Sequence, residues 1–326
     1  MGRRVARLAL VVGALLVIVG VAAAGEGPAY PRKPITLIVP YPPGGVSDLT
    51  ARPLAQEMHS LLPHPVVIVN RAGGGGTVGF AEAIQARPDG YTLAWGSVGI
   101  SAIQPHLTDL PYKTPEDYKV VINVASSSEV FAIRGDGPWK SMQELVGYAK
   151  VNPGKVRVAI PGVGSIQQML FESLKDLAGV EFVGVPFAGG GEAIPALLGG
   201  HVEGIVIAPA PLLGYITAGT ARPLATFSEK RDVGSPDVPT MKELGYDIAK
   251  DEYLFVALPK ATPDSIAQTL HDAFKKAMES ESFKKFAREK GLVVKYEGAT
   301  ELRKRLASDY AFYGDLIKRK KLTLSK

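Results

Sequence analysis

Short runs of apolar, β-branched residues alternate along the chain with stretches in which apolar residues recur at helical spacing. The short runs predict six strands, at residues 35–40, 65–70, 91–95, 156–160, 181–186 and 202–207. The other stretches predict helices between these strands, followed by two longer amphipathic helices at residues 263–278 and 300–319. Because helices follow strands many times over, the pattern predicts parallel α/β sheets with helices on their faces.

Capping boxes mark three helix starts. In such a box a Ser or Thr side chain accepts a hydrogen bond from the amide three residues on, and the Glu or Gln side chain at that position accepts one from the amide of the Ser or Thr. The pairs are Ser141 with Glu144, Ser165 with Gln168, and Thr240 with Glu243. Two helices also carry apolar stripes that predict buried faces. The stripes are Ile166, Met169, Leu170, Leu174 and Leu177 in one helix, and Leu302, Leu306, Tyr310, Tyr313 and Ile317 in the other.

The domain organisation has to be inferred from length. No segment rich in Pro, Gly or Ser divides the chain in two, and no internal repeat is visible. Yet the chain has 326 residues, more than the roughly 250 that a single core holds comfortably. A chain that crosses between two domains more than once would satisfy both observations. A ligand is then expected in the cleft between the domains.

The first 24 residues predict an export signal. A basic head precedes an apolar run at residues 8–21, and small residues lead to a cleavage site that we place after Ala24. An uncleaved membrane anchor is the alternative, but the run is shorter than a bilayer requires. The chain has no cysteine, so neither a disulfide nor a lipid-attachment site is expected. We therefore expect a soluble periplasmic protein that is not a lipoprotein.

Charge gives little information about partners. Lys and Arg number 37 against 32 Asp and Glu. Three of the basic residues, Arg3, Arg4 and Arg7, lie in the predicted leader, so the remainder is close to neutral. The densest basic run, at residues 318–321, falls in a helical pattern and is typical of a solvated face. No nucleic-acid partner is expected.

The segment PYPPGGVSDLTARPLAQ, at residues 40–56, joins a predicted strand to a predicted helix. In an α/β sheet it lies at the carboxyl end of a strand, where ligands bind. Gly44 and Gly45 would let the backbone approach a ligand, and the amides of Val46, Ser47 and Asp48 would begin the helix without intrahelical partners. The loop is a candidate anion site. Alternatively, Ser47 or Asp48 only caps the helix and the glycines only make the turn.

Two further loops repeat the order of strand, glycines and helix. In IPGVGSIQQ, at residues 160–168, the amides of Val163, Gly164 and Ser165 could face a ligand from the other domain. The capping box also explains Ser165 and Gln168, so a purely structural role stays open. The third loop is PFAGGGEA, at residues 186–193.

Other groupings do not favour an enzyme, a cofactor or a metal site. The segment GGGGTVG, at residues 73–79, fits a dinucleotide-binding pattern, but the next strand ends at residues 95–97 without an acid for the ribose. There is no G-x-S-x-G elbow and no thiol nucleophile, and the five histidines lie at no metal-ligand spacing. The acid pairs Glu116 with Asp117 and Asp251 with Glu252 lie at turns or strand starts, and are expected to be solvated.

An ordered set of motifs covers almost the whole chain after the leader. It comprises YPRKPITLIVPYPPGGVSDLTAR, VVIVNRAGGGGTVGFAEA, PDGYTL, PGVGSIQQ, VPFAGGGEAIPALLGGHVE, AGTARPLATFSEKRDVGSPDVPTMKELGYD and TPDSI. With these motifs the chain resembles the substrate-binding proteins of tripartite tricarboxylate transporters, the Bug-type, TctC-like extracytoplasmic solute receptors. Each motif alone would be weak, but the ordered set is specific.

The resemblance implies a periplasmic-binding-protein fold of the type II class, with two α/β domains around a cleft. We expect residues 25–128 and 252–326 to form one domain and residues 129–251 the other. Such receptors hold small carboxylates mainly through backbone amides of two facing loops. The ligand-binding positions implied here are Tyr41, Gly44, Gly45, Val46, Ser47, Asp48, Ser97, Val98, Gly162, Val163, Gly164, Ser165, Gln168, Phe187 and Ala188.

Two positions depart from the family pattern. The family often has histidine where Gln168 stands, and an aromatic-lysine-glycine run where this chain has Phe187, Ala188 and Gly189. Loss of that lysine removes a fixed positive charge from the cleft, and Gln168 can donate a hydrogen bond but cannot ionise. A di- or tricarboxylate bound as in relatives with a charged cleft is therefore in doubt.

The expected function is that of a monomeric, non-enzymatic receptor. It would capture a small organic carboxylate, a mono- or dicarboxylate with aromatic acids included, and deliver it to the membrane permease of a tripartite tricarboxylate transporter. One alternative is the same fold acting as the sensing subunit of a signalling system. The other is a secreted α/β hydrolase that uses Ser47 or Ser165, for which no histidine is placed by a motif.

Overall fold

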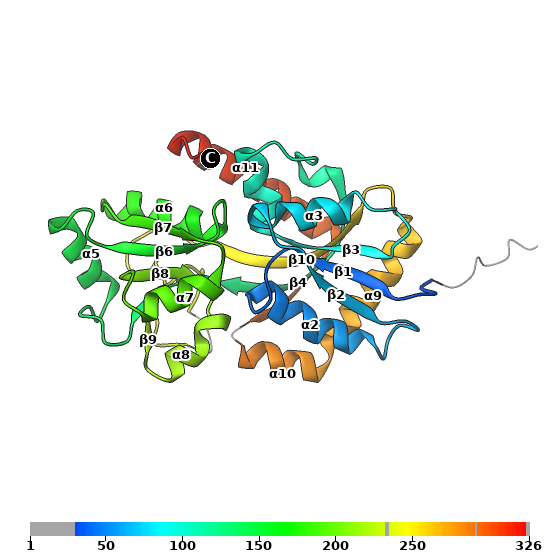
Figure 1. Cartoon of the computed structure of the whole chain (residues 1–326), viewed down its shortest axis with the longest axis horizontal. Coiled ribbons are helices and arrows are strands. Elements are labelled where there is room, and N and C mark those ends of the chain that lie inside the picture. The colour runs from blue at the N-terminus through cyan, green and yellow to red at the C-terminus, as the bar shows by residue number, and fades with distance from the viewer. Residues whose placement is uncertain (1–29, 232–234, 291, 324–326) are drawn as a thin grey trace, which may run out of the picture.

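The computed structural model describes residues 30–231, 235–290 and 292–323, so the predicted leader lies outside the described residues. Two sheets form the two halves of the molecule (Figure 1). The first has the order β11-β4-β10-β3-β1-β2 and the second the order β7-β6-β8-β5-β9. The strands of the first sheet are β1 (Ile35–Val39), β2 (Val66–Asn70), β3 (Thr92–Ser97), β4 (Tyr118–Ser128), β10 (Asp251–Pro259) and β11 (Val293–Gly298). Those of the second are β5 (Val130–Arg134), β6 (Arg157–Pro161), β7 (Val183–Phe187), β8 (Gly204–Ile207) and β9 (Ala221–Thr226).

All six predicted strands form, as β1, β2, β3, β6, β7 and β8. The expected parallel pairing holds for these six strands, while other strands make both sheets mixed. Strands β1, β2 and β3 pair in parallel, as do β6, β7 and β8. Strand β10, however, returns from the second half of the molecule and inserts between β3 and β4, antiparallel to both. Strand β5 likewise runs antiparallel to β8 and β9.

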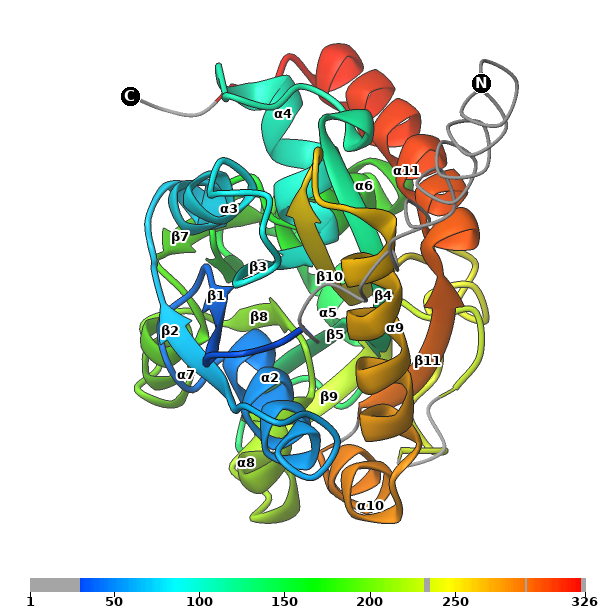
Figure 2. The same ribbon diagram turned by 90° about the vertical axis from the view of Figure 1, so that its right-hand side faces the viewer.

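Helices cover both faces of the first sheet (Figure 2). Ile35, Leu37 and Val39 of β1 pack in one apolar cluster with α2 (Val46–Met58), α9 (Asp264–Glu279) and α10 (Glu281–Glu289). Ile38 points to the opposite face, into a cluster with α3 (Thr77–Ile84) and α11 (Ala299–Lys320). This alternation along one strand is what a sheet buried on both faces requires.

The second sheet is also covered on both faces. Its bounding helices are α5 (Met142–Val151), α6 (Ile166–Ala178), α7 (Gly190–Leu198) and α8 (Leu213–Thr217). Four of the five predicted stripe residues of α6 are buried, but Leu177 is 48% exposed and Phe171 is buried instead. The stripe of α11 is buried at Leu302, Leu306, Tyr313 and Ile317. Tyr310 is half-buried and stacks against His106 of α4 (Gln104–Leu107).

The helix predicted after Thr240 is absent from the described residues. Both halves of its capping box form, with the Glu243 amide 3.0 Å from Thr240 Oγ1 and the Thr240 amide 2.9 Å from a Glu243 carboxylate oxygen. Residues 241–245 nevertheless make only turns. Gly245, at a φ of +90°, ends the segment in the left-handed region before a second turn can form.

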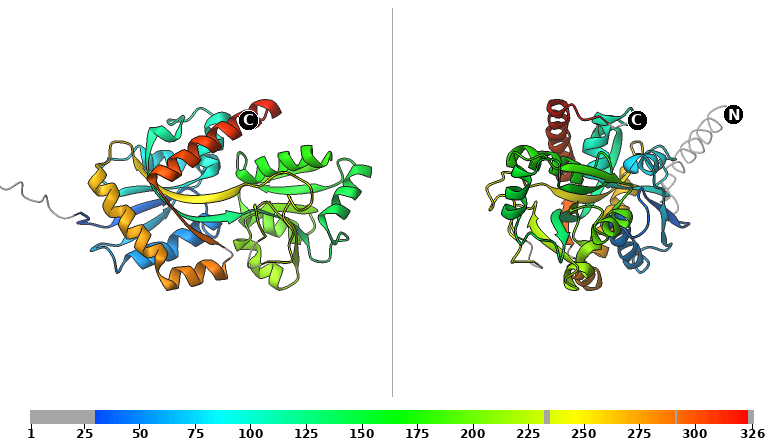
Figure 3. Two further views of the ribbon diagram at one scale, coloured as in Figure 1. Left: turned by 180° about the vertical axis from the view of Figure 1, so that it is seen from behind. Right: turned by 60° about the vertical axis from the view of Figure 1, so that its left-hand side comes forward.

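The chain crosses between the two halves twice, as predicted. Strand β4 leads into β5 with one residue between them, and β10 carries the chain back (Figure 3). Helix α11 adds a further contact, because Lys320 at its end pairs with Asp176 of α6. None of the helices in the described parts of the chain is both long and apolar enough to span a bilayer. The fold is thus a two-domain α/β structure with two interdomain crossovers.

Candidate functional site

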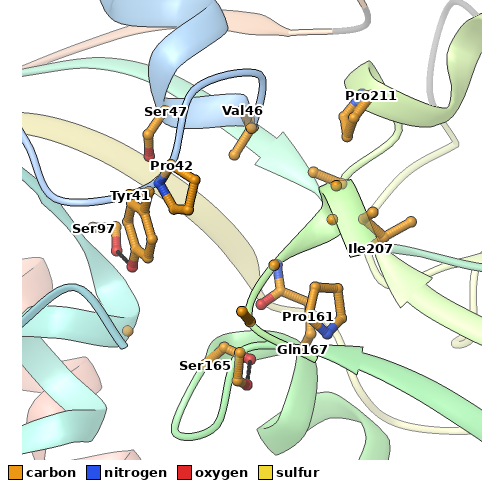
Figure 4. A pocket seen from close by; sticks show the side chains of 18 of the residues that line it. Tyr41, Pro42, Val46, Ser47, Ser97, Pro161, Ser165, Gln167, Ile207 and Pro211 are labelled. Atoms are coloured by element: carbon orange, nitrogen blue, oxygen red, sulfur yellow. Dashed lines mark hydrogen bonds between the residues drawn. The ribbon is translucent and has the colours of Figure 1, made fainter. Parts of the chain in front are cut away.

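A cavity of about 210 Å³ lies where loops of the two domains face each other. The cavity is lined by parts of the segments 41–47, 161–167 and 188–192, together with single residues such as Ser97 and Glu252. Figure 4 shows Tyr41, Ser97 and Ser47 on one side and Ser165 and Gln167 on the other. The strands β1, β6 and β7 end at these loops, so the cavity occupies the carboxyl edges of parallel strands in both sheets.

The first loop ends at Gly45, which is the N-cap of α2 and makes no side-chain cap. Among the described residues, no hydrogen bond is donated by the amides of Gly45, Val46, Ser47 or Asp48. These amides begin a helix of 13 residues, whose N-terminal end carries partial positive charge. The loop therefore offers main-chain donors at the edge of the cavity.

The Asp48 side chain holds this loop in place. Its Oδ2 accepts from the Gly44 amide at 3.1 Å, its Oδ1 accepts from Asn70 Nδ2 at 3.0 Å, and Arg52 pairs with it at 2.8 Å. Burial alone would raise the pKa of Asp48, but these hydrogen bonds outweigh burial and hold the pKa below its ordinary value. Gly44, at a φ of +86°, makes the turn that this arrangement needs.

The second loop is held in the same way. Ser165 caps α6 by accepting from the Gln168 amide at 3.3 Å, and Gln168 Oε1 accepts from the Gly164 amide at 2.7 Å. The return bond thus goes to the residue before the N-cap, not to the N-cap itself as in a capping box. The amides of Val163 and Ser165 donate to no group within the described residues.

The third loop repeats the device. Glu192 Oε2 accepts from the Ala188 amide at 3.3 Å, again four residues back, at the start of α7. In all three loops a polar side chain in the first helical turn ties down one upstream amide. Other amides at the three helix starts, those of Ser47, Ser165 and Gly190 among them, have no acceptor within the described residues and belong to residues that line the cavity.

The floor of the cavity is made of hydroxyl and carboxyl groups. Tyr41 Oη lies 3.1 Å from Ser97 Oγ, and Glu252 Oε1 accepts from the Val98 amide at 3.2 Å. Burial, with a contribution from Glu252, raises the pKa of Tyr41, so this side chain stays a phenol. Burial also raises the pKa of Glu252 to about 8. The described residues that line the cavity include the carboxyls of Glu192 and Glu252 but no Lys, Arg or His.

The match to known proteins decides the family. Residues 50–322 match the sequence profile of the tripartite tricarboxylate transporter family receptor. The chain belongs to this receptor family. A UPF0065 protein of Cupriavidus necator is 36% identical over 83% of the chain and 82% of its own length. Protein BugT of Bordetella pertussis is 34% identical over 85% of the chain and 86% of its own length. The receptor is therefore of the Bug type.

Solved structures are similar over nearly the whole receptor. The periplasmic binding protein BugD is 28% identical with a TM-score of 0.84, over 90% of this chain and 99% of its own. MatC of Rhodopseudomonas palustris with bound malate is 26% identical with a TM-score of 0.82, over 88% and 100%. An R. palustris protein with adipate is 25% identical with a TM-score of 0.86, over 91% and 100%. The receptor therefore has the periplasmic-binding-protein fold.

Most of the sequence-predicted site residues line the cavity of the receptor. They are Tyr41, Gly45, Val46, Ser47, Ser97, Gly162, Val163, Ser165 and Ala188. Four others lie behind the lining and form the hydrogen bonds that fix the two loops, and these are Gly44, Asp48, Gly164 and Gln168. Val98 donates its amide to Glu252, and Phe187 packs against the apolar cluster under α7.

Sequence reasoning missed several lining residues. Gly75, in the glycine run that fits a dinucleotide-binding pattern, lines the cavity and lies beside Val163. Gln167 and the glycines at residues 189–191 also line the cavity. The expectation that Glu252 is solvated is wrong, because the side chain is 6% exposed and forms part of the floor. In the sequence Glu252 stands at the start of a strand, and this position gave no indication that its carboxyl is buried. Among the described residues, no group of three or more His, Asp or Glu side chains could hold a metal ion.

Proposed function

We propose that this receptor captures a small organic carboxylate in its interdomain cleft and delivers it to the permease of a tripartite tricarboxylate transporter. We further propose that it is exported with a cleaved leader, acts as a monomer and binds its ligand without converting it. In this proposal residues 25–128 with 252–326 form one domain and residues 129–251 the other. Malate and adipate in two structurally similar proteins support a carboxylate as the ligand class.

The observation that carries the proposal is the pair of helix N-termini on opposite sides of one cavity. The amides that begin α2 and α6 lie in the lining from different domains, with no internal acceptor among the described residues. A carboxylate is the small group that such amides and helix ends attract. The predicted contacts are the amides of Gly45, Val46, Ser47, Val163 and Ser165, with Ser97, Tyr41, Gly162 and Ala188 completing the lining.

Main-chain donors can supply enough free energy. A carboxylate that accepts four or five such hydrogen bonds gains about 1.5–3 kcal/mol from each. Several kcal/mol are needed to remove the ligand charge from water. In the upper part of this range the remainder reaches the roughly 8 kcal/mol of a micromolar complex. Binding of this strength needs no arginine or lysine.

Calorimetric titration of the purified protein with a panel of mono- and dicarboxylates, including malate and adipate, tests the proposal. We expect at least one acid to bind, and Gly45→Val to lose that binding while the variant still folds. Gly45 has an ordinary φ, and a Cβ there meets only the Pro42 carbonyl oxygen at 3.9 Å, so the folded protein has room for the side chain. The valine side chain would, however, occupy the space through which the ligand reaches the amides. Gly147→Val is the matched control, because Gly147 of α5 has nothing within 4 Å and lies outside the cavity.

Two results would contradict the proposal. If no acid in the panel binds the wild-type protein, the carboxylate class is wrong. If Gly45→Val binds as tightly as Gly147→Val, the first loop is not a ligand contact. Deletion of the receptor gene, followed by uptake assays with the acid that binds, separates transport from the sensing role, because only a transport receptor is required for uptake.

A further inference from the structure

Two carboxyl groups are buried where the chain crosses between the domains. Glu129 is the single residue between β4 and β5, and Glu252 is the second residue of β10. Glu129 has no exposed surface, and Glu252 is 6% exposed and lines the cavity. Gln167, which also lines the cavity, donates from Nε2 to Glu129 Oε1 at 2.9 Å. Both acids therefore lie at or directly behind the floor.

Neither carboxyl has a cationic partner within ion-pair distance among the described residues. Glu252 Oε1 accepts from the Val98 amide, while Glu129 Oε2 is fully buried without a hydrogen-bond partner. An ionised carboxylate buried without a cation costs several kcal/mol, so such a group takes up a proton. Burial raises the pKa of Glu129 well above its ordinary value, and the charge of Glu252 would raise it further.

Other charged or titratable residues surround Glu252. They come from β10 itself, from the first loop, from the β4–β5 crossover and from α11, and are Asp251, Tyr253, Tyr41, Glu129, Arg305 and Tyr313. Arg305 is the cation of this set, and it forms an ion pair with Glu297 at 3.0 Å and stacks on Tyr253. It lowers the pKa of Glu252 by less than burial raises it.

We propose that Glu252 is a ligand-contacting residue that stays protonated at neutral pH and donates a hydrogen bond to the bound anion. The inference rests on the proposed function, since it assigns the floor of the same carboxylate cleft. With Tyr41 and Ser97, Glu252 forms a floor of neutral hydroxyl donors beneath the amides of α2 and α6. Such a neutral group donates a hydrogen bond to a carboxylate or hydroxyl oxygen of the ligand without adding a fixed positive charge to the cleft.

This floor sets the direction of a pH dependence. Binding requires the protonated acid, so affinity is full below the pKa of Glu252, about 8, and falls as the pH rises through it. From one pH unit below that pKa to one unit above, the protonated fraction falls about tenfold, and affinity falls by the same factor. A dicarboxylate can thus be held in a cleft without a cation, at the cost of binding that weakens in alkaline solution.

The experiment compares the wild-type protein with Glu252→Gln. Gln keeps the size of the side chain and a hydrogen-bond donor but cannot ionise. With the acid that binds best in the carboxylate panel, calorimetry at pH 7 and pH 9 should show an approximately tenfold loss for the wild type. Glu252→Gln should have the same affinity at pH 9 as at pH 7, whatever that affinity is, because its side chain does not titrate. Glu252→Ala should be weaker at both pH values.

Asp251→Asn is the matched control. Asp251 is the neighbour of Glu252 on β10, and its side chain contacts Ser128 and lies outside the cavity lining. Removal of its charge should leave the tenfold pH dependence in place. If Asp251→Asn removes the dependence as Glu252→Gln does, the effect comes from the net charge near the crossover strands and the assignment to Glu252 is overturned.

Two further results decide between this inference and its rivals. Loss of affinity in Glu252→Gln at pH 7, with stronger wild-type binding at pH 9, would show that Glu252 is ionised and accepts a hydrogen bond from the ligand, and would overturn the inference alone. Failure of every acid to bind the wild type would overturn the proposed function. Independently of any ligand, the ¹³C-carboxyl NMR signal that is missing in Glu252→Gln should titrate near pH 8, and a signal already ionised at pH 6 would refute the assignment.

Discussion

The bonds around Asp48 lead to a prediction for Asp48→Ala. The substitution removes the acceptor of the Gly44 amide and of Asn70 Nδ2, and it removes the partner of Arg52. The two hydrogen bonds to a buried carboxylate are worth about 1.5–3 kcal/mol each. Asn70 keeps its bond to the Tyr41 carbonyl, and the Arg52 side chain is half exposed, so the ion pair adds little. We expect the free energy of unfolding to fall by about 3–6 kcal/mol, which is the sum for the two bonds.

The same substitution should weaken ligand binding although Asp48 lies outside the cavity lining. Without its tie to Gly44, the turn that presents the α2 amides has to be ordered when the ligand binds. Ordering one residue costs about 1–2 kcal/mol, which corresponds to a rise of about tenfold in Kd. Urea denaturation measures the first effect and calorimetry with the bound acid measures the second.

The control is Asp136→Ala, which removes an exposed acid paired with Arg134 and should change stability by less than about 0.5 kcal/mol. Low pH supplies a second check. Because the pKa of Asp48 is lowered in the folded state, its stabilisation is present above the unfolded pKa of about 3.9 and is lost as the pH falls through the folded value. The difference between wild type and variant should therefore shrink in acid. A variant as stable as Asp136→Ala, or one that is less stable yet binds with unchanged affinity, would refute the reasoning.

Two further substitutions test the cleft itself. Gln104→Ala removes the bond from Gln104 Nε2 to the Val163 carbonyl at 2.8 Å, which joins α4 of one domain to the second loop of the other. Kd should rise about fivefold to tenfold, and small-angle scattering should show a more open ligand-free protein. Unchanged affinity and shape would exclude a role of this bond in domain closure. Ala188→Lys places a cation in the cavity lining. Affinity for dicarboxylates should rise about tenfold at low salt and by less at high salt. An equal gain for monocarboxylates at all salt concentrations would contradict a Coulombic cause.

The local pattern of the sequence was sufficient for the strands that pair in parallel. Each of these strands is a short apolar run followed by its own helix, so the information lies within about 30 residues. It was not sufficient for β10 and the crossovers. Residues 251–259 begin with two acids, and only the tertiary pairing with β3 and β4 buries them. Glu252 accepts from Val98, which lies 154 positions away in the chain, so no local pattern could place its carboxyl in the cavity floor.

The loops show a different reason for incomplete prediction. Glycines between a strand and a helix correctly predicted where main-chain donors meet. The roles of the polar side chains were harder to predict, because Asp48 and Gln168 could bind a ligand or hold a loop. A pattern was present in the sequence, since Asp48, Gln168 and Glu192 each stand four residues after the amide they bind. One such spacing is common, and it gained meaning only when the structure brought the three loops to one cavity.

The arrangement of donors also explains how binding and closure would be coupled. The α2 amides belong to one domain and the α6 amides to the other, and the domains are joined by the β4–β5 crossover and by β10. A carboxylate that contacts both sets of amides gains the second half of its hydrogen bonds only when the domains are close together. A ligand shifts the equilibrium by the difference between its affinities for the closed and open states, so two such bonds, at about 3–6 kcal/mol together, would favour closure by more than a hundredfold. An acid too short to reach both loops would bind to one domain and leave the cleft open.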